Sequence, residues 1–462
     1  MPRTRAEPAV TDMLQDTIAA ISTPLGESGL AVVRLSGLAS LRIADSCFRP
    51  VGSSSKSASA AGTHTVQYGK MKRDGKTIDE VLLTVLRAPR TFTREDMVEI
   101  SCHGGILPAK LVLDALLAAG ARLAEPGEFT KRAFLNGRID LTQAEAVADL
   151  IHSRTELALD AANEQLAGKL SRRIEELRDQ LVQTLAHIEA HIDFPDEDIA
   201  PDTKDQLIRR LESGLSFMDQ LLATASEGQI LRRGIRAAII GRPNAGKSSL
   251  LNQLLGHERA IVSPVPGTTR DTIEETANIR GIPVVFVDTA GIRDSNDLIE
   301  AEGIRRSRES LARAELVLEV IDASEAVKPG ERIGAQDGKK HLLVLNKIDL
   351  PQRAQVSEPA HRVSCTSGEG LEQLKDAIRD AVWSGRVGGE MNQVMINARH
   401  QEALQRARHH TRHTIDALRS NQTLELSAMD LRIATNAIGE IVGKTTTEHI
   451  LDSIFSQFCI GK

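Results

Sequence analysis

Aromatic residues are scarce in this chain. They make up only 2% of its 462 residues, with a single tryptophan and a single tyrosine. Proteins that bind single-stranded nucleic acids by base stacking need several exposed rings, so the composition disfavours that mode of recognition. The cores must instead be built from leucine, isoleucine, valine and alanine, which fits a helix-rich protein.

Cysteines and long apolar runs are also few. The four cysteines, Cys47, Cys102, Cys365 and Cys459, lie far apart in the chain. Their spacing predicts neither a disulfide framework nor a zinc knuckle. The N-terminal stretch lacks the apolar centre of a signal peptide, and no run reaches the roughly 18 apolar residues of a membrane span. We therefore expect a cytoplasmic protein that does not bind membranes.

The chain has no excess of positive charge. Its 57 lysines and arginines are outnumbered by 63 aspartates and glutamates, which gives a net charge of −6 and a pI near 6.2. This balance argues against a protein whose whole surface binds nucleic acid, although it permits a local basic patch. Hydrophobic residues account for 41% of the chain, enough for real cores, and the length predicts about three domains.

The hydrophobic pattern divides the chain. Residues 1–136 mix short strand-like runs with a helix-like run at Ile106–Ala119, and this mixture predicts a small α+β domain. Residues 137–230 show helical periodicity, which returns in residues 389–462 and is predicted to continue to the chain end. Because residues 231–388 differ from both flanks, we interpret them as a domain inserted into a helical domain.

The helical stretches can be placed more closely. Leucine and isoleucine recur at steps of three and four from Leu170 to Ile192, which predicts one long amphipathic helix. The pattern breaks at Phe194, and a second helix is predicted from about Lys204 to Ala225.

The inserted segment alternates continuous apolar runs with helical stretches. Such runs are typical of parallel strands that are buried on both faces, and the helices between them suit right-handed βαβ units. The sequence therefore predicts a mostly parallel sheet, so that the whole chain is a multidomain α/β and α protein. The predicted strands are Arg236–Ile240, Val284–Val287, Leu316–Ile321 and Leu342–Leu345.

A phosphate-binding motif follows the first of these strands. Residues 241–248 match the pattern GxxxxGKS between a predicted strand and a predicted helix. The glycines let backbone amides surround phosphate oxygens, and the helix N-terminus adds positive potential. Lys247 would contact the terminal phosphates, and the Ser248 hydroxyl would bind Mg²⁺.

Three further elements occur in the order expected for a GTPase. Asp288 follows a strand and can hold Mg²⁺ through water, while Thr269 can bind Mg²⁺ directly when a triphosphate is present. The Asp349 carboxylate can accept hydrogen bonds from guanine N1–H and the exocyclic amine, which adenine cannot offer. The residues predicted to contact GTP are Asn244, Ala245, Gly246, Lys247, Ser248, Ser249, Thr268, Thr269, Asp288, Thr289, Ala290, Gly291, Asn346, Lys347, Asp349, Ser364, Cys365 and Thr366.

One position departs from the Ras pattern. In Ras a glutamine at this point orients the attacking water, whereas here Ile292 can neither donate nor accept a hydrogen bond. Another group must position the water. Arg242, Arg270 and Arg293 lie nearby in the sequence, but none can be assigned as an arginine finger. The candidate catalytic residues here are Lys247, Arg270 and Asp271.

Several stretches outside the nucleotide motifs match one protein family. They are Val33–Gly37, Glu99–Gly105, Pro126–Thr130 and Ala133–Ala146, and the chain ends on Cys459-Ile460-Gly461-Lys462. On these residues the chain resembles the MnmE/TrmE family of tRNA-modification GTPases over nearly its whole length. An unrelated GTPase would not match at both ends.

The resemblance implies a homodimer and a one-carbon donor. The N-terminal domains would dimerise and bind 5-formyltetrahydrofolate or another one-carbon tetrahydrofolate, with contacts from Arg34, Glu99, Arg138 and Lys462. A cation can pair with the folate glutamate tail, and a carboxylate can accept from the pterin ring. Arg138 stands where some members have lysine, which keeps the charge.

The resemblance also implies a partner and a substrate. With a flavoprotein of the MnmG type, in a heterotetramer, the family adds an aminomethyl or carboxymethylaminomethyl group at the 5-position of the wobble uridine of certain tRNAs. Because this chain is acidic overall, we expect the partner to hold much of the tRNA.

Potassium is the third implication of the resemblance. A K⁺ ion in a dimer of G domains would supply the charge of an arginine finger, with ligands from Asn244, Ser263, Val265 and Thr268. Glu300 matches the glutamate that orients the water.

Two cysteines raise separate questions. A Cys459 thiolate could attack the uracil ring, although a near-terminal cysteine is more often packed or merely exposed. Cys365 replaces the alanine usual in the base-pocket element, and the similar size predicts a minor effect on guanine contact.

Two other functions would leave parts of the sequence unused. A regulatory switch of the ribosome-assembly kind needs neither the N-terminal domain nor the stretch Cys459–Lys462, and it would usually carry a basic RNA-binding appendage. A helical scaffold with a vestigial G domain would not need intact Lys247, Ser248 or Asp349.

Overall fold

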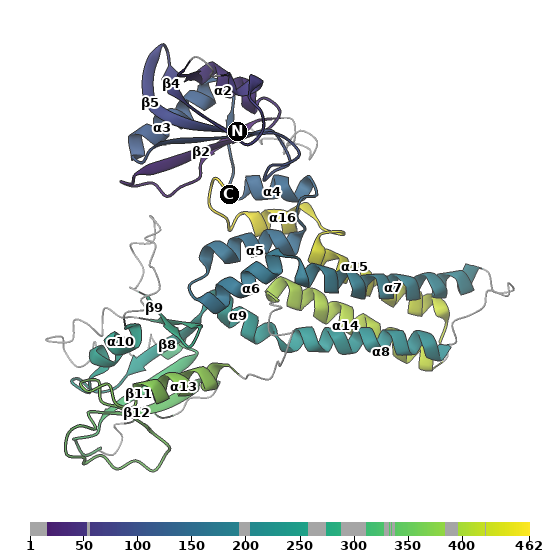
Figure 1. Ribbon diagram of the computed structural model, residues 1–462. Coiled ribbons are helices and arrows are strands. Elements are labelled where there is room, and N and C mark those ends of the chain that lie inside the picture. The colour runs from purple at the N-terminus through teal and green to yellow at the C-terminus, as the bar shows by residue number, and fades with distance from the viewer. Residues whose placement is uncertain are drawn as a thin grey trace, which may run out of the picture. The chain divides into compact units, whose positions relative to one another are not determined.

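The computed structural model describes residues 16–52, 56–193, 204–256, 274–287, 311–327, 332, 334, 338–383, 396–420 and 422–462. The chain forms two compact units, one of Met1–Glu145 with Val442–Lys462 and the other of Ala146–Ile441. Figure 1 shows both units, coloured along the chain. The predicted domain boundaries at residues 136, 230 and 388 stay predictions.

The first unit contains a seven-stranded sheet with the strand order β3-β4-β5-β6-β2-β1-β7. Neighbouring strands are antiparallel except β1 and β7, which are parallel. The strands are β1 (Ile18–Ile21), β2 (Leu30–Ser36), β3 (Phe48–Pro50), β4 (Thr65–Arg73), β5 (Lys76–Leu86), β6 (Met97–His103) and β7 (Arg122–Leu123).

Helices α2 (Ser40–Cys47) and α3 (Ile106–Ala118) cover one face of this sheet (Figure 1). Because side chains alternate along a strand, Val33 and Leu35 enter that core while Arg34 lies on the opposite face. A second, smaller core forms there, where Phe129 of α4 (Glu128–Leu135) packs with Ile18 and Met97. The α+β prediction for this part of the chain is confirmed.

The C-terminal segment belongs to the same unit. Helix α16 (Glu448–Phe455) lies beside α4 (Figure 1). The prediction that helix continues to the chain end is wrong, because the backbone after Phe455 pairs with other segments instead. Ile460 forms a bridge with Pro126, and Gly461 has a φ of +93°, a value that suits glycine.

The second unit contains long helices that precede its sheet in the sequence and others that follow it. Helices α7, α8 and α14 run alongside one another (Figure 1). Most of the predicted apolar stripe of α7 is buried, while Leu185 and Ile192 are half-buried. The helices are α5 (Leu141–His152), which crosses the boundary between the units, α6 (Glu156–Leu166), α7 (Lys169–Asp193), α8 (Lys204–Ala223), α9 (Ala225–Arg233), α14 (Ala398–Arg419) and α15 (Leu424–Val442). No helix within the described part of the chain is long and apolar enough to span a bilayer.

Helix α9 is an addition to the sequence prediction, which placed residues 137–230 in a helical region but predicted no separate helix after about Ala225. The helix continues to Arg233, past the break at Thr224, whose hydroxyl donates to the Leu221 carbonyl oxygen at 2.7 Å. The segment was missed because Gly228 weakens the helical pattern and few apolar residues mark a buried face.

A six-stranded sheet with the order β13-β12-β11-β8-β10-β9 completes this unit. Only the edge strand β9 is antiparallel to its neighbour, so the predicted mostly parallel sheet is confirmed. Helices α10 (Lys247–Leu255) and α13 (Leu371–Val382) pack on the same face. The strands are β8 (Ile235–Ile240), β9 (Glu275–Ile279), β10 (Ile282–Phe286), β11 (Leu316–Asp322), β12 (Lys340–Asn346) and β13 (His361–Arg362).

Candidate functional site

The phosphate-binding loop lies at the end of β8, between β10 and β11. Strand order reverses at this point, and ligands of parallel sheets bind in the crevice that results. Gly241 and Gly246 have positive φ values of +145° and +93°. A Cβ at Gly241 would lie 2.2 Å from the Val320 carbonyl oxygen, and one at Gly246 would lie 2.1 Å from Asn346 Nδ2. Both positions therefore require glycine.

Lys247 begins helix α10 and turns back over the loop. Its Nζ donates to the carbonyl oxygens of Gly241 at 2.9 Å and Arg242 at 2.7 Å. Burial lowers the pKa of Lys247, because the charged form is separated from water. Both partners are neutral oxygens, so a phosphate in the loop would form a stronger, charge-assisted bond with this ammonium group.

Asn346 joins the phosphate loop to the predicted base pocket. Its Nδ2 donates to the Ala245 carbonyl oxygen at 3.0 Å, and its Oδ1 accepts from the Cys365 backbone amide at 3.3 Å. The Asn346 side chain is thus satisfied on both sides and fixes the distance between the two loops. The structure brings together the predicted residues 244–249, 346–349 and 364–366.

The other residues of the predicted base pocket follow the end of β12 in the sequence. Lys347 has a φ of +65° and its Nζ donates to Asp322 Oδ2 at 2.6 Å, while Asp349 is exposed. Burial raises the pKa of Cys365 to about 11, so its thiol stays neutral near pH 7 and acts as a small packing group. This contact of Lys347 with Asp322 was not predicted.

The remaining nucleotide and metal predictions lie outside the described residues and stay predictions. They concern Ser263, Val265, Thr268, Thr269, Arg270, Asp271, Asp288, Thr289, Ala290, Gly291 and Glu300.

A second site lies on the face of the N-terminal sheet that is opposite α2 and α3. Arg34 of β2 and Glu99 of β6 are opposite each other in the strand register, and Arg34 Nε donates to Glu99 Oε1 at 2.9 Å. The guanidinium carbon lies 5.9 Å from the ring centre of Phe92 and 5.6 Å from that of Phe129. Arg34 Nη1 also donates to the Gly461 carbonyl oxygen at 3.2 Å.

The other two predicted folate contacts gather around the same residues. Arg138 lies over Phe92 at 4.9 Å, so this ring contacts two guanidinium groups. Burial lowers the pKa of Lys462, and the charge of Arg34 lowers it further. The structure thus places all four predicted residues in one cationic, partly aromatic site. Cys459 is an exposed free thiol in the same C-terminal segment.

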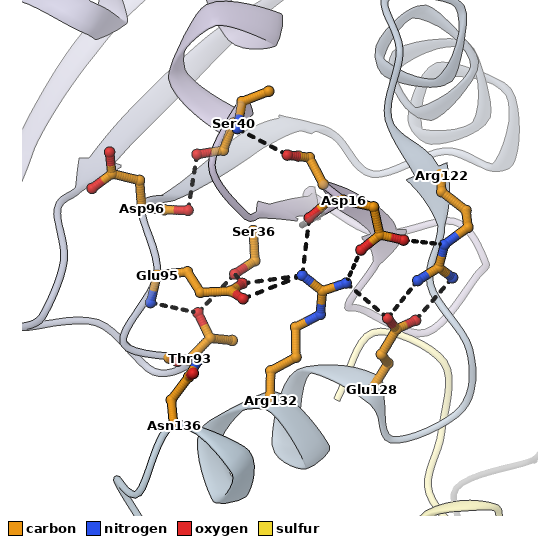
Figure 2. A network of polar contacts seen from close by, with 12 residues as sticks. Asp16, Ser36, Ser40, Thr93, Glu95, Asp96, Arg122, Glu128, Arg132 and Asn136 are labelled. Atoms are coloured by element: carbon orange, nitrogen blue, oxygen red, sulfur yellow. Dashed lines mark hydrogen bonds and ion pairs between the residues drawn. The ribbon is translucent and has the colours of Figure 1, made fainter. Parts of the chain in front are cut away.

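A buried charge network supports this site. Arg132 is only 1% exposed, and its guanidinium pairs with Glu128 at 3.0 Å, Glu95 at 3.2 Å and Asp16 (Figure 2). Arg122, which is 41% exposed, shares Asp16 and Glu128 with it. The sequence prediction missed this network, although the spacing of Glu128 and Arg132 at i and i+4 was a signal for a pair on one helix.

The network also fixes the loop that carries Phe92. Glu95 accepts from the Ser36 hydroxyl at 2.7 Å as well as from Arg132. At the other end of the loop, Asn136 Nδ2 donates to the Thr93 carbonyl oxygen at 2.6 Å (Figure 2). Phe92 is therefore attached through its neighbours to β2 and to the end of α4.

Two family profiles match almost the whole chain. One describes the MnmE helical domain and matches residues 141–459, and the other describes the N-terminus of the GTP-binding protein TrmE and matches residues 17–138. The chain belongs to the MnmE/TrmE family.

Individual MnmE proteins are similar along their full length. Proteins named tRNA modification GTPase MnmE from Geobacillus kaustophilus and Listeria welshimeri are each 45% identical, over 97% of this chain and 99% of the relative. Among solved structures, the G domain of the T. maritima FeoB iron transporter is 25% identical over 32% of this chain and 98% of its own, with a TM-score of 0.23.

Proposed function

We propose that this chain binds and hydrolyses GTP and couples hydrolysis to the modification of tRNA. The observation that carries the proposal is the phosphate loop whose Lys247 ammonium is held by neutral carbonyl oxygens, joined through Asn346 to a guanine-type base loop. Membership of the MnmE/TrmE family and the names of the relatives support the tRNA part.

In this proposal the described residues bind and orient the nucleotide. Lys247 would exchange its carbonyl partners for phosphate oxygens, and the first amides of α10 would donate to the same group. Asp349 would accept from guanine N1–H and its amine. The Ser248 hydroxyl at the start of α10 would hold Mg²⁺, which would supply positive charge beside the phosphates.

Potassium activation belongs to the same proposal. Asn244 is exposed in the phosphate loop with a φ of +62°, and its side-chain oxygen would serve as a K⁺ ligand. Positive charge from K⁺ would replace that of an arginine finger in a dimer of G domains. Glu300, Ser263, Val265 and Thr268 are proposed from the family resemblance.

The substrate proposal is specific. The cationic site around Arg34 fits a one-carbon tetrahydrofolate, since Glu99 offers a carboxylate to the pterin ring while Arg138 and Lys462 offer positive charge to a glutamate tail. With an MnmG-type flavoprotein and as a homodimer, the chain would add an aminomethyl or carboxymethylaminomethyl group at the 5-position of the wobble uridine.

Nucleoside analysis of tRNA from a deletion strain tests this function. We expect total tRNA from that strain to lack the 5-substituted wobble uridines, and the parent gene to restore them. A Lys247→Ala gene should not restore them, because the variant loses the phosphate contact. Unchanged wobble uridines in the deletion strain would contradict the proposal and favour a regulatory switch.

Glu300→Ala tests the proposed hydrolysis mechanism. We expect the variant to bind GTP as the parent does but to hydrolyse it about 10²-fold more slowly, a typical loss for a group that positions the attacking water. Single-turnover hydrolysis in K⁺ buffer measures it, with nucleotide affinity as the control. Hydrolysis at the parent rate would remove Glu300 from the mechanism.

A further inference from the structure

A row of positive side chains continues beyond Arg34 in the N-terminal unit. Arg34 and Arg138 both lie over the ring of Phe92, at 5.9 Å and 4.9 Å. Arg94 lies next to Arg138 in space. Its Nη1 is so close to the backbone of Gly137, the residue before Arg138, that a Cβ built there would lie 3.5 Å from it. The row therefore runs from Arg34 through Arg138 to Arg94.

The two outer arginines carry charge that no described acidic side chain offsets. Arg34 pairs with Glu99, whereas Arg94 and Arg138 make no ion pair with a carboxylate among the residues that the structure describes. Burial lowers the pKa of Arg138, and the positive charge of Arg94 lowers it further. Neighbouring guanidiniums that repel each other form a site that an anion would stabilise.

The loop that carries Arg94 is fixed without a ligand. Arg94 has a φ of +60°, a left-handed conformation that residues of its type rarely adopt. Its Nη1 donates to the Asn136 carbonyl oxygen at 2.9 Å, and Asn136 in turn donates to the Thr93 carbonyl oxygen. The pair of Arg132 with Glu95 secures the next turn of the loop (Figure 2). Strain that the surroundings maintain in this way is typical of functional sites.

We propose that Arg94 and Arg138 bind the oligo-γ-glutamyl tail of a folate whose ring lies at the Arg34 site. This inference rests on the proposed folate function and extends it to the length of the ligand. Each added γ-glutamyl residue carries one more carboxylate, and a guanidinium binds a carboxylate through paired hydrogen bonds. Arg94 uses one of its five N–H groups on Asn136, which leaves others for the tail.

A short row of this kind favours an oligocarboxylate over RNA. The two outer arginines continue directly from a site with aromatic and paired charged groups, where the tail of a small ligand would emerge. RNA held by its backbone needs many cations along an extended surface. The net charge of −6 provides no such surplus over the chain as a whole.

Calorimetric titration of the full chain with 5-formyltetrahydrofolate tests the inference. Forms with one and with three γ-glutamyl residues are compared at low salt. We expect the triglutamate to bind the parent about tenfold more tightly, which corresponds to about 1.4 kcal/mol. In Arg94→Gln this ratio should fall below about twofold, because one guanidinium is lost. Arg42→Gln changes an exposed arginine of α2, a helix on the other face of the sheet, and should keep the parent ratio.

The outcomes distinguish failure of the tail inference from failure of the proposed folate function on which it rests. Equal affinities for the two folates overturn the inference and leave the folate site intact. If neither form binds, both the inference and the folate proposal fail. If tRNA binding weakens in Arg94→Gln while the folate ratio stays at the parent value, the row contacts RNA and the inference is wrong.

Discussion

Asp349→Asn is expected to change the nucleotide specificity of this chain from GTP to XTP. The carboxylate can accept from both guanine N1–H and the exocyclic amine, whereas an amide accepts one bond and donates the other. Xanthine carries an oxygen in place of that amine, so the amide suits it. Since hydrogen bonds to charged groups contribute about 1.5 to 3 kcal/mol each, GTP affinity should fall at least about a hundredfold.

Competition between GTP and XTP for the purified variant measures the change. Asp349 is exposed and lies three residues after β12, close in sequence to Asn346 and Lys347, and in the proposed function its carboxylate reads the base. Asp380→Asn is the matched control, because Asp380 is an exposed carboxylate on α13. It should leave the preference for GTP unchanged. An Asp349→Asn protein that still prefers GTP would show that another residue reads the base.

Arg132→Met is expected to destabilise the N-terminal unit strongly. The substitution leaves Asp16, Glu95 and Glu128 without the guanidinium that all three contact. Removing one partner of a buried charge network costs about 3 to 5 kcal/mol. Because a chain of several domains does not unfold in two states, a local measurement is needed. Hydrogen exchange of the amides in β1 and α4 should quicken by at least about a hundredfold.

Arg122→Met is the matched control for that network. Arg122 contacts the same two carboxylates, Asp16 and Glu128, but is 41% exposed where Arg132 is 1% exposed. The loss of Arg122 should therefore lower the stability of the N-terminal unit by only about 1 kcal/mol. Amides of β12 in the other unit should exchange at parent rates in both variants. Equal effects of the two substitutions would mean that burial does not set the strength of these pairs.

Acid should weaken the same network. Burial alone raises the pKa of Glu128, but hydrogen bonds from Arg122 and the Glu125 amide, with the charges of Arg132 and Arg122, hold it below its ordinary value of 4.5. Stability from this carboxylate is present above that value and is lost as the pH falls through the lower folded pKa. Arg132→Met lacks the guanidinium that pairs with Glu128. The difference between parent and variant in the exchange rates of the β1 and α4 amides should therefore become smaller in acid.

Much of the second unit, which carries the phosphate-binding loop, was predictable because its sequence signals are local. The loop at residues 241–248 is defined by backbone conformations that only glycine tolerates, and the strands beside it are continuous apolar runs. The stripe of α7 has the period of a buried helix face. These features depend on residues a few positions apart, so the sequence alone carries them.

The arginine-rich site depends on contacts that no local pattern records. Arg132 is charged and would be expected at the surface, yet it is buried because Asp16 and Glu95 from distant segments join Glu128 of its own helix around it. Phe92 and Arg94 lie in a loop with no regular period, and Gly461 approaches Arg34 from the other end of the chain. The family resemblance located Arg34 and Arg138, but only the structure joined them through the Phe92 ring.

The most direct test of the coupling between nucleotide hydrolysis and tRNA modification uses the Asp349→Asn protein. It would be added to a gel-filtered extract of the deletion strain, whose tRNA lacks the modification, with GTP or XTP as the only added nucleotide. We expect 5-substituted wobble uridine to form with XTP and not with GTP, and the reverse for the parent protein. Modification by the variant without XTP would contradict the proposed coupling.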